Sequence, residues 1–186
     1  MPPKRKPAQE AVLDTAGQAH KEAKGGLKIG DNLPDLVALE TDESKPDAEK
    51  KVSLKEATIE RGAIIFVYPK ANTPGCTKQA CSFNESVDKL GKAGYQIFGL
   101  SADKPKSQAN WKQKHNMTFT LLCDPSQEVL KQLGVIKAGK ITRSHFVIEK
   151  GGKVKDIQLG ISPAKSIVEA IKVLGIEEEE PQEGSS

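Results

Sequence analysis

The segment from Ala63 to Tyr68 places the strongest constraint on how this chain can fold. It is an uninterrupted run of β-branched, aromatic and small apolar residues, and Pro69 follows it directly. Such a run is typical of a strand that is buried on both faces of a sheet. The rest of the chain must therefore supply a layer of structure on each side of this strand.

After this strand, helical and extended patterns alternate along the sequence. Apolar residues recur from Cys76 at spacings of three and four, which predicts a helix that Gly91 closes. The predicted helices cover 76–91, 105–115 and 163–174, with a short one through Leu133. Ser126 is the expected N-cap of the short helix, and Ser162 is the expected N-cap of the helix over 163–174. The predicted strands cover 36–39, 52–54, 63–68, 95–100, 121–123, 146–149 and 154–159, and the last two form a hairpin around Lys150-Gly-Gly-Lys153.

The order of these elements is that of the thioredoxin-like fold: strand, helix, strand, helix, strand, hairpin and closing helix. We therefore expect an α/β domain with a central mixed β-sheet flanked by helices. A chain of 186 residues with 37% hydrophobic side chains can bury one such core. We assign the domain to residues 27–175, a disordered basic tail to 1–26 and a disordered acidic tail to 176–186.

Charge and hydropathy exclude several classes of protein. The net charge is only +3, from 28 basic and 25 acidic residues, so we expect no strong nucleic-acid binding. No apolar run approaches the roughly 20 residues that cross a bilayer, and no signal peptide is evident, so we expect a soluble intracellular protein without membrane association. The basic run Lys4-Arg5-Lys6 is either a nuclear import signal or part of a solvated tail. We expect a nuclear location, with a cytoplasmic one as the alternative.

Three cysteines are too few for the disulfide framework of a small secreted domain. In a reducing compartment, a close pair of cysteines more often has a chemical role than a structural one. Cys76 lies where a buried strand meets a predicted helix, and the unpaired N–H groups and dipole of a helix N-terminus favour a thiolate. The alternative is that Cys76 is a small buried apolar residue. Pro69 and Pro74 stiffen the loop before it, and this loop favours the reactive alternative.

The cysteine pair does not have the spacing of a metal site. Cys81 follows Cys76 by five residues, which is neither a C-x-x-C motif nor a zinc knuckle, and two more ligands would be needed. The pair can instead be a reactive cysteine and its partner, because a sulfenic acid condenses with a nearby thiol. Cys123, in a short apolar strand, is expected to be an inert core thiol, with a regulatory role as the alternative. We expect no metal and no organic cofactor.

The sequence around these cysteines resembles a known active site. The run Tyr68-Pro-Lys-Ala-Asn-Thr-Pro-Gly-Cys-Thr-Lys-Gln-Ala-Cys81 looks like that of the atypical two-cysteine peroxiredoxins of the PrxQ, or bacterioferritin comigratory protein, subfamily. The Pro-x-x-x-Thr-x-x-Cys signature of the family falls on Pro69, Thr73 and Cys76, and its Arg-x-x-Phe motif begins at Arg143. The resemblance covers about residues 27–174. With its basic N-terminal tail, the chain is similar to the nuclear thiol peroxidases of fungi.

The resemblance implies an activity and a set of site residues. It implies a peroxidase that reduces hydrogen peroxide and alkyl hydroperoxides, acts as a monomer and accepts electrons from thioredoxin. Cys76 would be the peroxidatic cysteine and Cys81 the resolving cysteine of an intramolecular disulfide. The expected peroxide-binding residues are Pro69, Thr73, Gly75 and Arg143, with the Thr73 hydroxyl offered to a peroxide oxygen and Arg143 to the thiolate.

Three further expectations concern the rest of the chain. The rival function is a non-enzymatic chromatin or nucleic-acid adaptor, although three clustered basic residues neutralise few of the roughly 6–10 phosphates that tight binding uses. His145 is expected to be exposed, and Trp111 to belong to the core or to a partner surface. In an intact helix, residues five apart have Cα atoms near ~8.7 Å apart, beyond the ~7 Å limit for a disulfide, so a Cys76–Cys81 bond requires the helix to unwind.

Overall fold

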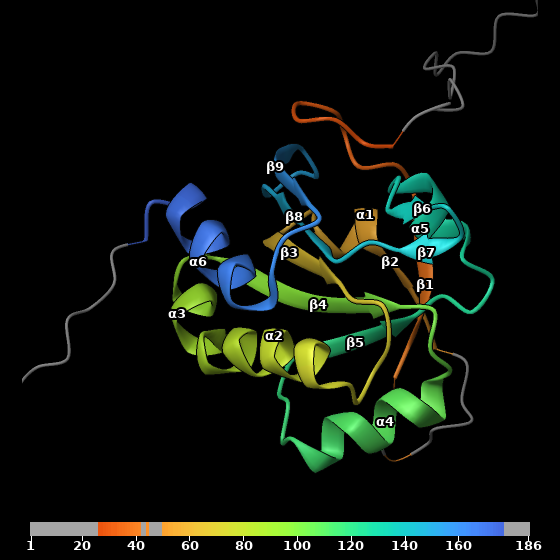
Figure 1. Ribbon diagram of the computed structural model, residues 1–186. Coiled ribbons are helices and arrows are strands. Elements are labelled where there is room, and N and C mark those ends of the chain that lie inside the picture. The colour runs from red at the N-terminus through yellow and green to blue at the C-terminus, as the bar shows by residue number, and fades with distance from the viewer. Residues whose placement is uncertain (1–25, 42–43, 45–49, 177–186) are drawn as a thin grey trace, which may run out of the picture.

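The computed structural model describes residues 26–41, 44 and 50–176, and it has a central mixed sheet between layers of helices (Figure 1). The strands are β1 (Val37–Glu40), β2 (Lys50–Ser53), β3 (Gly62–Val67), β4 (Tyr95–Ser101), β5 (Thr120–Cys123), β6 (Ile136–Lys137), β7 (Lys140–Ile141), β8 (Ser144–Ile148) and β9 (Val154–Leu159). The helices are α1 (Leu54–Ala57), α2 (Pro74–Glu85), α3 (Val87–Lys92), α4 (Pro105–Lys114), α5 (Glu128–Gln132) and α6 (Pro163–Val173). The expected α/β class is confirmed.

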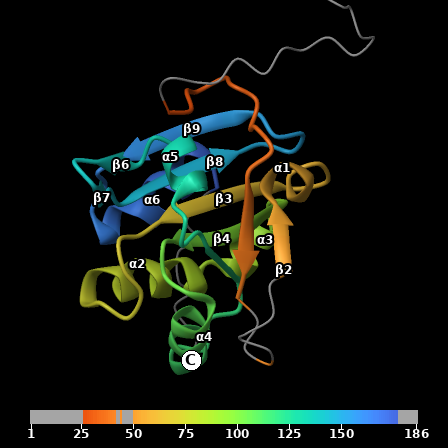
Figure 2. The ribbon, with the colours of Figure 1, turned by 90° about the vertical axis from the view of Figure 1, so that its right-hand side faces the viewer.

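The main sheet has seven strands in the order β2-β1-β5-β4-β3-β8-β9. Strands β3, β4 and β5 are parallel to one another, and the remaining pairs are antiparallel. Strands β1 and β2 lie side by side at one edge of the sheet (Figure 2). Strand β3 is buried along its whole length, as the apolar run from Ala63 predicts.

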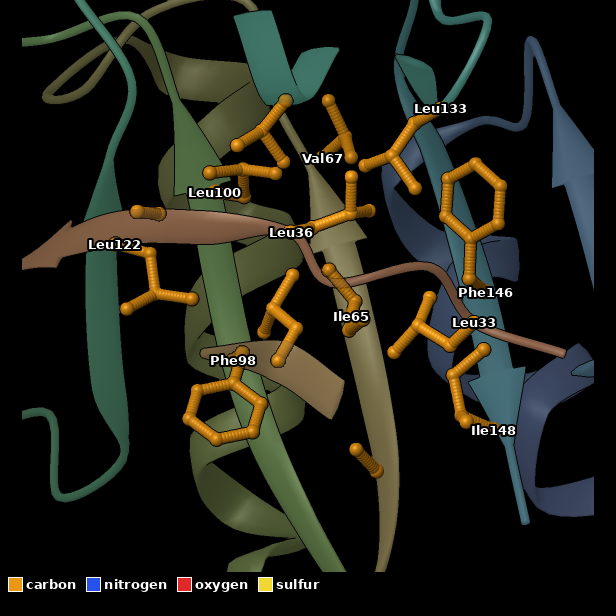
Figure 3. Packing of buried hydrophobic residues seen from close by; sticks show 14 of the residues in the cluster. Leu33, Leu36, Ile65, Val67, Phe98, Leu100, Leu122, Leu133, Phe146 and Ile148 are labelled. Carbon is orange, nitrogen blue, oxygen red and sulfur yellow. The ribbon is translucent and has the colours of Figure 1, made fainter. Parts of the chain in front are cut away.

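A hydrophobic core lies on each face of the sheet. Helices α1 and α5 cover one face, and its core includes Leu36, Ile65, Leu100 and Phe146 (Figure 3). Helices α2, α3, α4 and α6 cover the other face, where side chains from all four helices join the core. The candidate site lies in this second layer, because α2 begins directly after the loop that follows β3.

The helix predicted from Cys76 to Gly91 is two helices in the structure. Helix α2 begins at Pro74, and the chain breaks at Ser86 before α3 begins. The Ser86 hydroxyl donates to the Ser82 carbonyl at 3.2 Å, and its N–H donates to the Phe83 carbonyl at 3.1 Å. These local bonds compete with the regular helical ladder. Gly91 therefore lies inside α3 and does not close a helix.

The prediction that Ser126 caps a helix is wrong. Helix α5 begins at Glu128, and the Asp124 carboxylate accepts its first N–H at 3.1 Å and the N–H of Leu130 at 2.9 Å. An anionic acceptor with two oxygens satisfies more of the open N–H groups at a helix start than a hydroxyl can. Ser162 is the N-cap of α6 as expected, although its side chain makes no capping bond.

The prediction that His145 is exposed is also wrong, because its side chain is completely buried. Its strand, β8, pairs with β3 on one side and β9 on the other, so it is not an edge strand. His145 and Val147 face the same core, on the side that α6 covers. The alternation of polar and apolar residues along β8 therefore does not mark a solvated face.

Two extended segments differ from the predictions. Leu54 begins α1 and does not end strand β2, because the Ser53 hydroxyl accepts the N–H of Glu56 at 3.1 Å and starts a helix there. Strands β6 and β7 form a small hairpin near α5 that was not predicted (Figure 1). It turns at Ala138 and Gly139, which both have positive φ angles, as a two-residue hairpin turn requires.

The two predicted tails fall almost entirely outside the described residues. The basic run from Lys4 to Lys6 lies there too, so its role remains a prediction. Within the described ranges, no helix combines the length and the apolar character that crossing a membrane would need.

Candidate active site

Cys76 lies in the first turn of α2, on the carboxyl side of the buried strand β3. Thr73 is the N-cap and Pro74 the first helical residue. Cys76 is 2% exposed. The N–H groups of a first helical turn have no partner within the helix and carry the positive end of its dipole. The sequence prediction that Cys76 stands at a strand-to-helix junction is confirmed.

Thr73 does not cap α2 with its side chain. Its hydroxyl donates instead to the Lys70 carbonyl, at 2.9 Å, and so closes the loop on itself. The hydroxyl oxygen therefore keeps its lone pairs for an incoming donor, while its proton is already used. Thr73 is thus better suited to accept a hydrogen bond from a peroxide O–H than to donate one.

Arg143, directly before β8, lies against the Cys76 thiol. Its Nη2 is 3.4 Å from Sγ, and its Nη1 donates to Oε1 of Gln79 at 2.7 Å. The guanidinium therefore contacts two residues of α2 that lie one turn apart. This contact brings together the cysteine and the arginine that the sequence places 67 residues apart.

Gly75 makes room for the guanidinium. A Cβ atom at this position would lie 3.2 Å from Nη2 of Arg143 and 3.6 Å from Cγ of Pro163. A contact of 3.2 Å is tighter than ordinary van der Waals packing, so a side chain here would displace the arginine. Gly75 thus shapes the site through the absence of a side chain.

The loop between β3 and α2 is held in place by Asp103. The Asp103 carboxylate accepts the N–H of Ala71 at 2.7 Å and the Ser101 hydroxyl at 2.8 Å. Asn72, next in the loop, has a φ of 58°, a conformation that asparagine tolerates better than most residues. The loop that carries Pro69 and Thr73 is therefore anchored to the end of β4.

Trp111 of α4 packs beneath the first turn of α2. It is buried, its ring lies 5.1 Å from that of Tyr68, and its Nε1 donates to the Thr77 hydroxyl at 3.1 Å. Of the two alternatives for Trp111, the core position is the observed one. The bond to Thr77 also links α4 to the residue directly after Cys76.

Cys81 lies in the same unbroken helix as Cys76, and both thiols are free. Burial and the neighbouring carboxylate of Glu85 raise the pKa of Cys81. Its thiol is therefore protonated at neutral pH. The intact helix keeps the two cysteines too far apart for a disulfide, as helical geometry predicts.

Cys123 lies away from this site, in β5 beside β1. It is buried, its Sγ is 3.3 Å from the Thr41 hydroxyl, and burial raises its pKa to about 11. A thiol of this kind is a poor nucleophile at neutral pH. These observations support the interpretation of Cys123 as an inert core thiol.

Sequence analysis missed two residues of the site, Gln79 and Asp103. Gln79 lies three residues after Cys76, so helical spacing alone places both on one face and could have indicated it. Asp103 follows a predicted strand and gives no comparable signal. In the part of the chain that the structure describes, no three His, Cys, Asp or Glu residues are grouped to hold a metal ion.

The sequence and the fold are both similar to known proteins. The AhpC/TSA family profile matches residues 29–157. Peroxiredoxin bcp1 of Schizosaccharomyces pombe is 37% identical over 173 residues, which are 91% of this chain and 80% of that protein. Peroxiredoxin Bcp of Escherichia coli is 36% identical over 140 residues, or 70% and 85% of the two chains.

Solved structures agree with these relatives. Peroxidoxin BcpB from Mycobacterium tuberculosis superposes with a TM-score of 0.72 at 26% identity, over 82% of this chain and 99% of that one. A mutant of peroxiredoxin Q from Xanthomonas campestris superposes with a TM-score of 0.69 at 27% identity, over 77% and 94%.

Proposed function

Because the chain belongs to the AhpC/TSA family and is a peroxiredoxin, we propose that Cys76 is its peroxidatic cysteine and reduces hydrogen peroxide and alkyl hydroperoxides. One observation carries this assignment. Cys76 lies at the start of a helix with the Arg143 guanidinium 3.4 Å from its sulfur. A helix N-terminus and a permanent cation together favour a thiolate, which is the nucleophilic form.

In the peroxide step, the Cys76 thiolate attacks the terminal oxygen of the hydroperoxide and the O–O bond breaks. The sulfur becomes a sulfenic acid, oxidised by two electrons, and the other oxygen leaves as hydroxide or alkoxide and takes a proton from solvent to give water or an alcohol. Arg143 can donate to both the sulfur and the departing oxygen, because its guanidinium holds several donors in a fixed plane. The Thr73 oxygen and the N–H groups of the first turn hold the peroxide in line.

We assign the second step to Cys81. Its thiol attacks the sulfenic sulfur, water leaves, and a Cys76–Cys81 disulfide remains. Because α2 is continuous across both residues, its first turns must unwind before the sulfur atoms can meet. The turn that must open includes Thr77, whose bond to Trp111 is lost in the process.

The proposed reductant is thioredoxin, whose dithiol would attack the disulfide once the unwound segment is accessible. We also propose that the basic run at Lys4, Arg5 and Lys6 directs the protein to the nucleus, and that the protein acts as a monomer. Replacing the three basic residues with alanine would then spread a tagged protein into the cytoplasm. The rival adaptor function has no observation in its favour among residues 26–41, 44 and 50–176.

A coupled assay tests the proposed function. Peroxide consumption is followed with thioredoxin, thioredoxin reductase and NADPH, using the intact chain and the variants Cys76→Ser and Cys123→Ser. The first variant should lose turnover and the second should retain it, because only Cys76 contacts Arg143. Equal losses in both would contradict the assignment. Replacing thioredoxin with glutathione and glutaredoxin tests the reductant separately.

A further inference from the structure

A line of buried polar side chains extends from Arg143 into the core between α2, α6 and β8. Nη1 of Arg143 lies 2.7 Å from Oε1 of Gln79, and Nε2 of Gln79 lies 3.1 Å from the Ser166 hydroxyl. That hydroxyl lies 3.1 Å from Nδ1 of His145. Gln79, Ser166 and His145 have no exposed surface at all. Buried polar groups are costly unless they are satisfied, so their arrangement in one connected line requires an explanation.

One direction of donors and acceptors along this line satisfies every group in it. Arg143 has donors and no acceptor, so Gln79 must turn its oxygen toward it and its NH₂ group toward Ser166. Ser166 accepts from Gln79, and its own proton is then free for Nδ1 of His145. This direction places the His145 proton on Nε2. Each group fixes the orientation of the next one, from the guanidinium to the imidazole.

The far end of the line faces a carboxylate. Nε2 of His145 lies 3.6 Å from Oδ2 of Asp156 in β9, and it has no hydrogen-bond partner at normal distance among the described residues. The negative charge favours a proton on this nitrogen. Burial lowers the pKa of His145, while the carboxylates of Asp156 and of Glu169 in α6 oppose that effect. The imidazole is therefore neutral near pH 7, with Nδ1 open to accept.

We propose that Ser166 and His145 are positioning residues, which hold the Gln79 amide in the orientation that keeps the Arg143 guanidinium against the Cys76 sulfur. A glutamine amide can rotate by half a turn, and the rotated form would present NH₂ to the guanidinium and repel it. Ser166 alone cannot prevent this rotation, because a hydroxyl can donate as well as accept. His145 prevents it by taking the hydroxyl proton. This inference rests on the proposed peroxidase site and extends it to the residues that lie behind Gln79 and Arg143.

The decisive test is a double-mutant cycle on the peroxide step. The reaction of reduced protein with hydrogen peroxide is measured by quenched flow for the intact chain, Ser166→Ala, Arg143→Ala and the double variant. Ser166→Ala should slow the step by about tenfold, as the loss of one hydrogen bond worth about 1.4 kcal/mol does. In the Arg143→Ala background, Ser166→Ala should have no further effect, because Ser166 acts through the arginine.

Two further variants separate positioning from simple destabilisation. His145→Leu should slow the peroxide step about tenfold, and His145→Asn should recover most of the rate, because the asparagine oxygen can replace Nδ1 as an acceptor. Val147 lies on the same face of β8 and its side chain makes none of the hydrogen bonds of the line, so Val147→Ala should lower stability and leave the rate unchanged. Alkylation of Cys76 by iodoacetamide at pH 7 should be slower in Ser166→Ala than in the intact chain and unchanged in Val147→Ala.

The results distinguish this inference from the proposed function. If Ser166→Ala reacts as fast as the intact chain, or slows the Arg143→Ala background as much as the intact one, the positioning role is wrong while the peroxidase site stands. If Arg143→Ala itself leaves the peroxide step unchanged, the proposed site fails, and the positioning role fails with it. If Val147→Ala slows the peroxide step as much as His145→Leu does, the slower rate reflects general destabilisation, and the positioning role of His145 is wrong.

Discussion

Gly75→Ala should make the protein more stable and less active. Alanine favours a helix over glycine, and at Gly75 the backbone needs no positive φ, so the replacement should stabilise α2 by about 0.5 kcal/mol. The new Cβ, however, would lie 3.2 Å from Nη2 of Arg143. A relaxed contact of this kind is about 3.6 Å long, so the guanidinium must retreat by about 0.4 Å.

The geometry gives a rough size for the loss of activity. A misplacement of about 1 Å at a reacting group costs on the order of 100-fold in rate. If the cost in activation free energy grows in proportion to the displacement, a retreat of about 0.4 Å lowers the rate about sixfold. The loss should fall on the reaction with peroxide, because the arginine contacts the Cys76 sulfur and nothing in the replacement touches Cys81.

The assay pairs two measurements on two variants. The rate constant of the reduced protein with hydrogen peroxide and the urea midpoint of unfolding are compared for Gly75→Ala and Gly91→Ala. Gly91 lies in α3, where a Cβ would meet only Nη2 of Arg61, at 3.9 Å. The control should gain stability at full activity. If both variants keep the rate of the intact chain, Gly75 does not shape the position of Arg143.

Three further predictions concern the cysteines and the buried histidine. Cys81→Ser should react once with peroxide and then accumulate over-oxidised Cys76, and mass spectrometry that finds only the unmodified thiol would contradict this. Oxidised protein should exchange the amides of residues 76–83 faster than reduced protein; equal protection with the disulfide formed would exclude unwinding. Burial lowers the pKa of His145 in the folded protein below its usual 6.5. At a pH between 6.5 and this lowered pKa, the unfolded chain therefore binds a proton at His145 that the folded protein does not. Stability should therefore fall as the pH drops below 6.5, and His145→Asn should lack this part of the loss in urea titrations.

Strong local signals account for what the sequence predicted well. The apolar run from Ala63 specifies a strand buried on both faces, and the prolines mark the starts of α4 and α6. The position of Cys76 follows from the same signals, because its helix starts where the strand and its loop end. Arg143 could be assigned only through the family motif, since nothing local links it to a residue 67 positions away.

The errors occurred where long-range packing or side-chain competition decides. The pattern around His145 is compatible with a half-exposed strand, and only the packing of α6 over that face of β8 buries it. Ser126 and Asp124 are both residue types that suit a helix start, and the Asp124 carboxylate caps α5 because it accepts two of its N–H groups. Helical spacing places Gln79 on the same face as Cys76, but its hydrogen bonds depend on the approach of Arg143 and α6, which the sequence does not show.

The contact between Trp111 and Thr77 would let tryptophan fluorescence report the proposed redox cycle. Trp111 is the single tryptophan of the chain, and its indole lies against the turn that the proposed disulfide requires to unwind. Unwinding of this turn would break the hydrogen bond of Trp111 and admit water to this residue, which is 1% exposed while the turn is helical. Its emission should then shift to longer wavelength on oxidation and return on reduction. Trp111 would thus serve as an intrinsic optical probe beside Cys76, and each proposed turnover could be followed without a label.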